Sequence, residues 1–450
     1  MAIFDTVPLS PFVPPVELLI FAASAAIFYL VFVRRPHFRS NAPKVASNNW
    51  PIVGSLQFWT ARLDFWRKHL KETTTGNFSY HLGKHPVVGV SSKEGRDAFF
   101  FSRDLSVAEG YAVLFGQSPR IKDFEVVDGT RVDAARAETF DSFNTYFTKR
   151  IVAMLKADRL GKAIPTLVSD VRSCLDELGE SGLMDPFDNL FELVYKLTQR
   201  TVGANEIANS RPLLDRTLRL FQLIEKTSTS YQIIFPWLPS PAMFKRVWGG
   251  SQLYFIFSRI ANTRQKEGRR ENDGMQLLLD HGDDMTRIIG FVVGALFAGQ
   301  LNTGISVAAT VCYLAANPKW ISELRREVAA AAEKFTPGDS SPLPERLAKI
   351  PLAGWENELP TIELCARETM RLNMPGTAFR KNVSDKPVKI NEKEEIPPQT
   401  FGEFSIWLCC VRRLLEISNV SPGRPSPQSR CLHRPVHMGS CTISRPRRRG

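Results

Sequence analysis

The stretch MTRIIGFVVGALFAGQLNTGISVAATVCYLAA, from Met285 to Ala316, decides the fold of this chain. Its apolar residues recur with a helical period and Asn317-Pro318 ends the pattern, so it predicts the longest helix in the protein. Four glycines punctuate this helix, at positions 290, 294, 299 and 304. Because glycine weakens a soluble helix, they indicate close approach by something flat or bulky.

Helical periodicity continues on both sides of this stretch. Apolar residues recur at helical spacing in residues 143–155, 164–178, 186–202, 213–231, 242–267, 320–335 and 358–372, with a proline-rich break at 235–241. Residues 77–91 instead alternate in places between turn residues, which is typical of short strands. The chain therefore predicts a mainly α fold with a minor β-sheet up to about residue 375, without an internal repeat.

The amino-terminal segment has a different composition. Val16–Val33 is an apolar run of about the minimum length for one bilayer crossing. A cleaved signal peptide is the alternative, but the run is long for one and no basic segment precedes it. Basic residues follow it at positions 34, 35, 39 and 44, which predicts that the bulk of the chain stays in the cytoplasm. We expect an anchor at 1–35 and a proline-containing connector at 36–60.

The net charge of +12 is concentrated at the carboxyl end. Residues 401–450 contain nine arginines, no lysine and two glutamates, so the other 400 residues carry only +5. A basic nucleic-acid-binding face is therefore not indicated. Seven scattered cysteines argue against a secreted disulfide framework.

Residues 401–450 predict a disordered tail. After Leu415 they have no apolar periodicity, and from Pro422 they contain no acidic residue. Cys431, His433, His437 and Cys441 are zinc-ligand residue types, but their spacing matches no common zinc finger and is attributed to composition. One hypothesis is that a retained intron or frame error produced this tail, and sequencing the transcript across codons 395–410 tests it.

Several short motifs occur in a specific order. They are Trp50-Pro-Ile-Val-Gly54, the segment 83–88, Glu109-Gly110-Tyr111, the glycine-rich helix and Arg367-Glu368-Thr369-Met370-Arg371-Leu372. Together they resemble cytochrome P-450, the haem-thiolate monooxygenases, over about residues 16–400. Within this family, the chain is similar to fungal enzymes that are related to sterol 14-demethylases, sterol 7-hydroxylases and prostacyclin synthases. The resemblance implies a P-450-like helical domain at 61–400, truncated at its carboxyl end, with haem as the cofactor.

The resemblance assigns catalysis to one turn of the long helix. Ala298 and Gly299 match the small pair that opens room above the iron, and the family's next positions carry an acid and a threonine. Here Leu301 and Asn302 stand in those positions, with Thr303 adjacent. Leucine cannot relay a proton, whereas Asn302 can still hydrogen-bond oxygen or water. A glycine-tolerant buried core helix is the structural alternative for this turn.

The resemblance also assigns positions around the long helix. Glu368 and Arg371 lie three residues apart on one predicted helix face and are implied to form the family's structural pair. Arg380 is implied to face a haem propionate. The implied substrate cavity is lined by Tyr111, Met374, Pro375 and Thr377.

The chain departs from the family at the iron ligand. The Phe-x-x-Gly-x-Arg-x-Cys-x-Gly loop that should carry the ligating cysteine does not occur in the sequence. Cys409 and Cys410 stand too early, and neither Cys431 nor Cys441 has the surrounding motif. The expected metal ligand is therefore absent.

These observations leave three hypotheses. The family reading is a membrane-bound monooxygenase of secondary metabolism that oxygenates an apolar sterol, terpenoid or lipid-like substrate. It would use electrons from an NADPH-dependent flavoprotein reductase and contact membrane lipid, as a single-pass protein of the endoplasmic reticulum. The first alternative is a catalytically inactive truncated product. The second is a lipid isomerase or dehydratase on the same fold, which rests on Leu301 and Asn302.

Overall fold

The computed structural model describes two compact units of the chain. The described residues are 20, 36–107, 109–110, 142–179, 182–227, 229–235, 238–373, 376–405 and 443–444. Unit 1 contains Met1–Gly116, Ser230–Leu238 and Thr377–Ser405, and unit 2 contains the rest. Apart from Ile20, the predicted membrane anchor lies outside the described residues.

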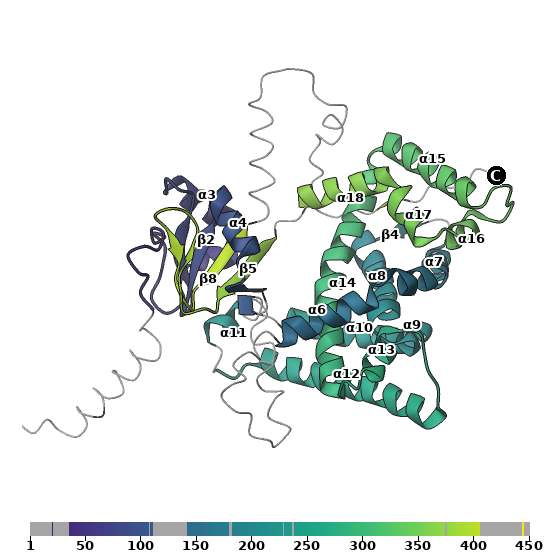
Figure 1. Ribbon diagram of the computed structural model, residues 1–450, viewed down its shortest axis with the longest axis horizontal. Helices are drawn as coiled ribbons and strands as arrows, with labels where there is room; N and C mark the ends of the chain where they lie inside the picture. Colours follow the sequence, from purple (N-terminus) through teal and green to yellow (C-terminus); the bar gives the residue numbers. More distant parts are fainter. Residues whose placement is uncertain are drawn as a thin grey trace, which may run out of the picture. The chain divides into compact units, whose positions relative to one another are not determined.

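Unit 1 is built around a five-stranded sheet in the order β1-β2-β8-β5-β3 (Figure 1). The strands are β1 Phe78–Leu82, β2 His85–Val90, β3 Leu105–Ser106, β5 Thr377–Asn382 and β8 Phe401–Ser405, with a separate pair β6 Val388–Lys389 and β7 Glu395–Ile396. The helices of this unit are α2 Leu56–Thr60, α3 Arg62–Lys71, α4 Lys93–Phe101 and α11 Ser230–Ile234. The sheet thus joins segments more than 300 residues apart in the chain, such as β1 and β8.

The strands predicted at residues 77–91 are confirmed as the β1–β2 hairpin. Gly83 makes its turn at a φ of +59°, a left-handed conformation that glycine adopts without strain. A Cβ at this position would also lie 3.1 Å from the Cα of Ile234 in α11. The tight turn and the close approach of α11 therefore both require glycine here.

β8 is a central strand of this sheet. It pairs parallel with β2 and antiparallel with β5, and all five of its residues are buried. The ordered sheet therefore continues five residues past the boundary expected at residue 400. The reason is apolar burial, because Phe401 and Phe404 pack into the unit 1 core.

Unit 2 is helical. Its helices are α6 Ser142–Met154, α7 Ala157–Leu178, α8 Pro186–Val202, α9 Asn205–Asn209, α10 Arg211–Lys226, α12 Pro241–Glu267, α13 Gly274–Asp280, α14 Met285–Ala315, α15 Pro318–Phe335, α16 Leu343–Ala348, α17 Leu352–Asn357 and α18 Pro360–Asn373. A two-stranded ribbon pairs β4 Leu183–Met184 with β9 Ile443–Ser444. The prediction of a mainly helical fold with a small sheet is confirmed.

Helix boundaries follow local capping chemistry. Asp284 begins α14 by accepting hydrogen bonds from the backbone N–H groups of Thr286 and Arg287 at 2.9 and 3.1 Å. Proline occupies the first turn of α12 and α15, so each helix begins slightly before its apolar pattern does. The single helix expected over residues 213–231 is instead two, α10 and α11, because α10 ends at Lys226.

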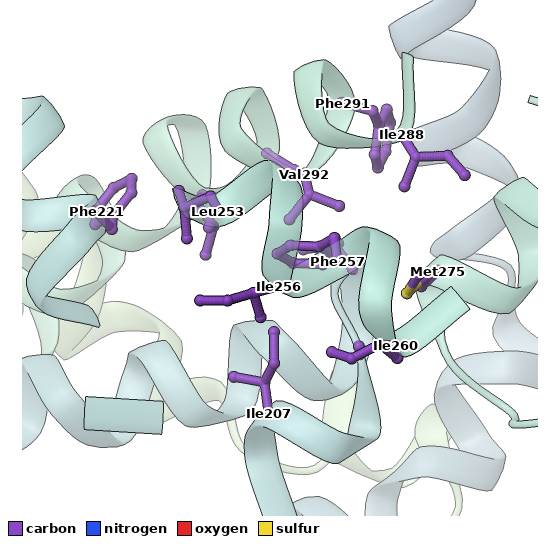
Figure 2. Packing of buried hydrophobic residues seen from close by; sticks show 14 of the residues in the cluster. Ile207, Phe221, Leu253, Ile256, Phe257, Ile260, Met275, Ile288, Phe291 and Val292 are labelled. Carbon is purple, nitrogen blue, oxygen red and sulfur yellow. The ribbon is translucent and has the colours of Figure 1, made fainter. Parts of the chain in front are cut away.

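The core of unit 2 forms where α14 meets its neighbouring helices. Figure 2 shows Leu253, Ile256, Phe257 and Ile260 of α12 packing toward Phe291 and other apolar side chains from α9, α10, α13 and α14. Within the described residues, α14 is the one helix long and apolar enough to cross a membrane. Since it packs against α8, α12 and α18, it is a core helix of this unit.

Candidate functional site

The four candidate catalytic residues lie within six consecutive residues of α14, from Ala298 to Thr303. Ala298, Asn302 and Thr303 are exposed, and Gly299 is half-buried. A Cβ built on Gly299 meets no atom within 4 Å, so there is open space beside this turn. The amide nitrogen of Asn302 donates to the carbonyl oxygen of Ala298 at 3.1 Å. The side chain of Asn302 is therefore held against its own helix in this structure.

Neighbouring residues hold this turn against α8. Gln300 is fully buried, and its Nε2 donates to the carbonyl oxygen of Phe191 at 2.6 Å. One turn later, a Cβ on Gly304 would lie only 2.8 Å from the Phe191 ring. At Gly304, the bulky group that approaches the helix is the aromatic ring of Phe191 on α8. Sequence reasoning missed Gln300, although a glutamine inside an apolar helix is a signal for a buried polar contact.

Glu368 and Arg371 form an ion pair on α18. The guanidinium donates to both carboxylate oxygens, from Nε at 2.6 Å and from Nη2 at 2.5 Å, and both side chains are about one-quarter exposed. Glu327 of α15 accepts the backbone N–H of Thr361 at 2.7 Å and thereby caps the start of α18. These contacts fix α18, which packs against α14 and α15.

Of the remaining candidate residues, two lie in unit 1 and three lie outside the described residues. Thr377 and Arg380 lie on β5 and are half-buried. The Arg380 guanidinium carbon lies 5.5 Å from the ring centre of Phe99 and 5.9 Å from that of Phe100, and its Nη1 donates to the Leu105 carbonyl oxygen at 3.5 Å. Tyr111, Met374 and Pro375 lie outside the described residues. Their roles, and a propionate contact for Arg380, stay predictions.

A buried carboxylate in unit 1 was not anticipated. Glu403 on β8 is fully buried and accepts hydrogen bonds from the Trp66 indole at 3.0 Å and from the Tyr80 hydroxyl. Burial raises the pKa of Glu403 to about 7, although both hydrogen bonds and the charge of Arg62 act in the opposite direction. Burial and the Glu403 charge also raise the pKa of Tyr80. The only sequence signal was an acidic residue inside the apolar run Phe401-Gly-Glu-Phe404.

The described residues contain no group of three His, Cys, Asp or Glu side chains that could hold a metal ion. None of the three cysteines among them, Cys174, Cys312 and Cys365, is in a disulfide, and all three are half-buried on helices. Burial raises the pKa of Cys174 and of Cys365, so both thiols remain protonated near neutral pH.

Comparisons with known proteins identify the family. Residues 43–410 match cytochrome P450. The chain is 32% identical to the cytochrome P450 monooxygenase AacuE of Aspergillus aculeatus, over 86% of this chain and 77% of that protein. It is 27% identical to the wheat (Triticum aestivum) obtusifoliol 14-alpha demethylase, over 54% of this chain and 52% of that protein.

Fold similarity agrees with the sequence matches. The solved structure of retinoic acid bound cyanobacterial CYP120A1 aligns with a TM-score of 0.61 at 14% identity, over 83% of this chain and 79% of that one. At this identity the likeness shows the fold alone. The family match and the fungal relative together establish that this chain belongs to the cytochrome P450 family.

Proposed function

We propose that this chain derives from a membrane-bound monooxygenase that inserts one oxygen atom from O2 into an apolar sterol, terpenoid or lipid-like substrate. The observation that carries the proposal is the turn of α14 at Ala298–Gly299, with open space beside Gly299. A small pair with free volume is what an oxygen-activating helix needs to admit oxygen and water. The name of the Aspergillus aculeatus relative, a monooxygenase, supports the same class of reaction.

The polar side chains at this turn can position a proton donor or water. Leu301 cannot exchange a proton, which leaves Asn302 and Thr303 as the hydrogen-bonding groups. For Asn302 to bind a ligand oxygen, its amide would have to exchange the bond to Ala298 for one to the ligand. The Asn302 side chain is exposed, so no packing barrier opposes this exchange, and the side chain of Thr303 is exposed as well. The proposed role of Asn302 is to orient a polar atom rather than to relay a proton.

The described residues do not fit the iron ligand that haem takes in this family. Haem activates oxygen in P450 proteins through a cysteine thiolate. Cys174, Cys312 and Cys365 lie inside helices α7, α14 and α18, and none of them stands in the loop sequence that carries the ligand in the family. The other four cysteines lie outside the described residues, and none occurs in the Phe-x-x-Gly-x-Arg-x-Cys-x-Gly sequence.

The missing ligand sequence favours a second candidate, a catalytically inactive product of the same family. Both units have apolar cores formed by described residues. Such a product can therefore fold without an iron ligand. A third candidate, a lipid isomerase or dehydratase, rests on Leu301 and Asn302. It is distinguished by product formation without an electron donor, whereas oxygenation requires an NADPH-dependent flavoprotein reductase.

The proposed location is the endoplasmic reticulum membrane, with a single crossing at Val16–Val33 and the folded units in the cytoplasm. The apolar length of this run and the basic residues that follow it support the proposal. A protease-protection assay on sealed microsomes tests it. Cleavage of the folded units by protease added outside is expected, and their protection would contradict the orientation.

The deciding experiment is the reduced, carbon monoxide-bound difference spectrum of the full chain expressed with haem supplied. A thiolate-type Soret shift that is lost in one Cys→Ser variant would identify a ligand outside the family motif and support the monooxygenase. Absence of the shift, in protein that unfolds cooperatively, would support the inactive product. Turnover of an oxygenated lipid without reductase would support the isomerase.

A further inference from the structure

Three polar side chains lie inside the apolar core of unit 2. Tyr195 and Gln199 stand one turn apart on α8, and Thr217 stands on α10. All three residues are 0% exposed. Their surroundings are apolar, since the Tyr195 ring packs against Phe221, which Figure 2 shows in the core. Because burial of a polar group costs free energy unless the group is hydrogen-bonded, this cluster needs partners.

The cluster is short of hydrogen-bond partners. Within the described part of the chain, neither the Tyr195 hydroxyl nor either end of the Gln199 carboxamide makes a hydrogen bond. Exchanging the nitrogen and oxygen of the carboxamide does not help, because both atoms lack a partner. The Thr217 hydroxyl donates to the carbonyl oxygens of Leu213 and Leu214 at 2.9 and 3.0 Å, which leaves its own oxygen as an acceptor.

The polar groups of the cluster lie near one another. Burial raises the pKa of the Tyr195 hydroxyl, and Thr217 and Gln199 are close enough to act in the opposite direction. They are therefore near the hydroxyl without bonding to it directly, which is the spacing at which a water molecule bridges polar groups. Among the described residues, no charged side chain acts on this pKa, so the space between the groups suits a neutral molecule.

The end of α8 fixes the position of Gln199. A Cβ built on Gly203 would overlap the Oε1 of Gln199, so the carboxamide takes up space that any other residue would fill. The φ of Gly203 is −106°, which other residues also adopt, so glycine is needed here for space. The backbone N–H of Gly203 donates to the Gln199 carbonyl oxygen at 3.1 Å and keeps the two residues together.

We propose that a water molecule is bound in the core of unit 2 between α8 and α10, where it accepts from the Tyr195 hydroxyl, donates to Oγ1 of Thr217 and bonds to the Gln199 carboxamide. Water offers two donors and two acceptors, and three polar partners are the usual number for a buried water. An apolar molecule would leave all three groups unpaired. The inference concerns the packing of unit 2 and goes beyond the proposed function.

This water links α10 to the helix that holds the candidate turn of α14. One turn before Tyr195, the carbonyl oxygen of Phe191 accepts from Nε2 of Gln300 at 2.6 Å, and the Phe191 ring lies against Gly304. Helix α8 therefore has a polar contact to α14 and, through the water, one to α10. The bound water thus belongs to the scaffold that positions α14.

The first test is the Raman spectrum of the full chain in detergent. The Fermi doublet of tyrosine reports whether the phenol hydroxyl is hydrogen-bonded. The chain contains eight tyrosines, so subtracting the spectrum of Tyr195→Phe isolates the signal of Tyr195. The intensity ratio of a hydrogen-bonded hydroxyl is expected. The ratio of a hydroxyl without a partner would overturn the proposal.

Two variants separate a water bridge from a direct bond. Gln199→Leu and Thr217→Val each remove one polar group and nearly keep its volume. With a bridging water, Tyr195 keeps its hydrogen bond in each single variant, because the water still has its other partners. Loss of the Tyr195 hydrogen bond in one of these variants would overturn the water bridge in favour of a direct bond to that side chain.

A double-mutant cycle measures the link between the two helices. Tyr195→Phe and Thr217→Val are each expected to raise the unfolding equilibrium constant about fivefold, and together about tenfold rather than about twenty-fivefold. Tyr254→Phe, which removes an exposed hydroxyl from α12, is the matched control and should leave the constant unchanged. A twenty-fivefold effect of the double variant, or a Tyr195→Phe chain more stable than the native one, would overturn the bridge.

Discussion

Replacing Glu403 with glutamine is expected to change how the stability of unit 1 depends on pH. Burial raises the pKa of this carboxyl from its ordinary 4.5 to about 7 in the folded chain. The folded chain therefore holds the proton more tightly than the unfolded chain. The stabilisation from this group is fully present below about pH 4.5 and is lost as the pH rises through 7.

The magnitude follows from the shift. A difference of about 2.5 pKa units corresponds to roughly 3 kcal/mol between pH 4.5 and pH 8, at about 1.36 kcal/mol per unit. Glutamine has nearly the same shape and no charge, so the Glu403→Gln variant lacks this pH dependence. At pH 5 the native carboxyl is protonated and neutral, like the amide, so we expect the two chains to be about equally stable. At pH 8 the native carboxylate is ionised and buried, so we expect the variant to be more stable by roughly 3 kcal/mol.

The assay is urea unfolding of the full chain in detergent at pH values from 4.5 to 8, followed by tryptophan fluorescence. Trp66 contributes to this signal at the altered contact because its indole bonds directly to Glu403, and the other seven tryptophans are common to both chains. Glu392→Gln, an exposed position near the β6–β7 turn, is the matched control and should follow the native curve. Parallel curves for the native chain and Glu403→Gln across this range would refute the reasoning.

Three further predictions concern unit 2. Arg264→Met leaves the carboxylate of Asp273 buried without its ion partner and should cost about 3–5 kcal/mol in the free energy of unfolding. Gly304→Ala should cost about 1–3 kcal/mol because the new methyl group meets a packed ring, whereas Gly299→Ala should stabilise by about 1 kcal/mol through helix propensity. Glu327→Ala removes the cap of α18 and should cost about 1 kcal/mol. Denaturant unfolding monitored by circular dichroism measures all of these changes.

Each of these predictions has a result that contradicts it. Arg270→Met breaks only an exposed pair with Asp280 and should cost less than about 1 kcal/mol, so an equal loss for Arg264→Met would show that the buried network contributes little. Equal effects of alanine at positions 299 and 304 would contradict the difference in space around the two glycines. A Glu327→Ala variant as stable as the native chain would mean that water caps α18 equally well.

Local patterns predicted the helices well and the long-range contacts poorly. The pattern at Met285–Ala316 gave α14 to within one residue, and the pattern at 186–202 gave α8 at both ends. The spacing of Glu368 and Arg371 put both on one helix face, where they form an ion pair. These features depend on residues within one or two turns of each other, so periodicity and capping contain the information.

The buried carboxylate of Glu403 shows where local reasoning ends. Its partner Tyr80 lies 323 residues earlier in the chain, and only the sheet order β1-β2-β8-β5-β3 brings the two together. The same pairing extends the ordered sheet beyond residue 400, where the amino-acid composition alone predicted the start of a disordered tail. Gln300 is a similar case, because its partner Phe191 is on a helix 109 residues earlier.

The central place of β8 also has a consequence for synthesis on the ribosome. The β1–β2 hairpin emerges early, but the partner of Val87–Val90 is made about 310 residues later. At roughly 5–20 residues per second, that edge of the hairpin waits on the order of 15–60 s with its backbone N–H and C=O groups unpaired. An exposed apolar strand edge is a template for wrong pairing with other chains. The nascent chain is therefore expected to need a chaperone over this interval, until the last strand closes the sheet.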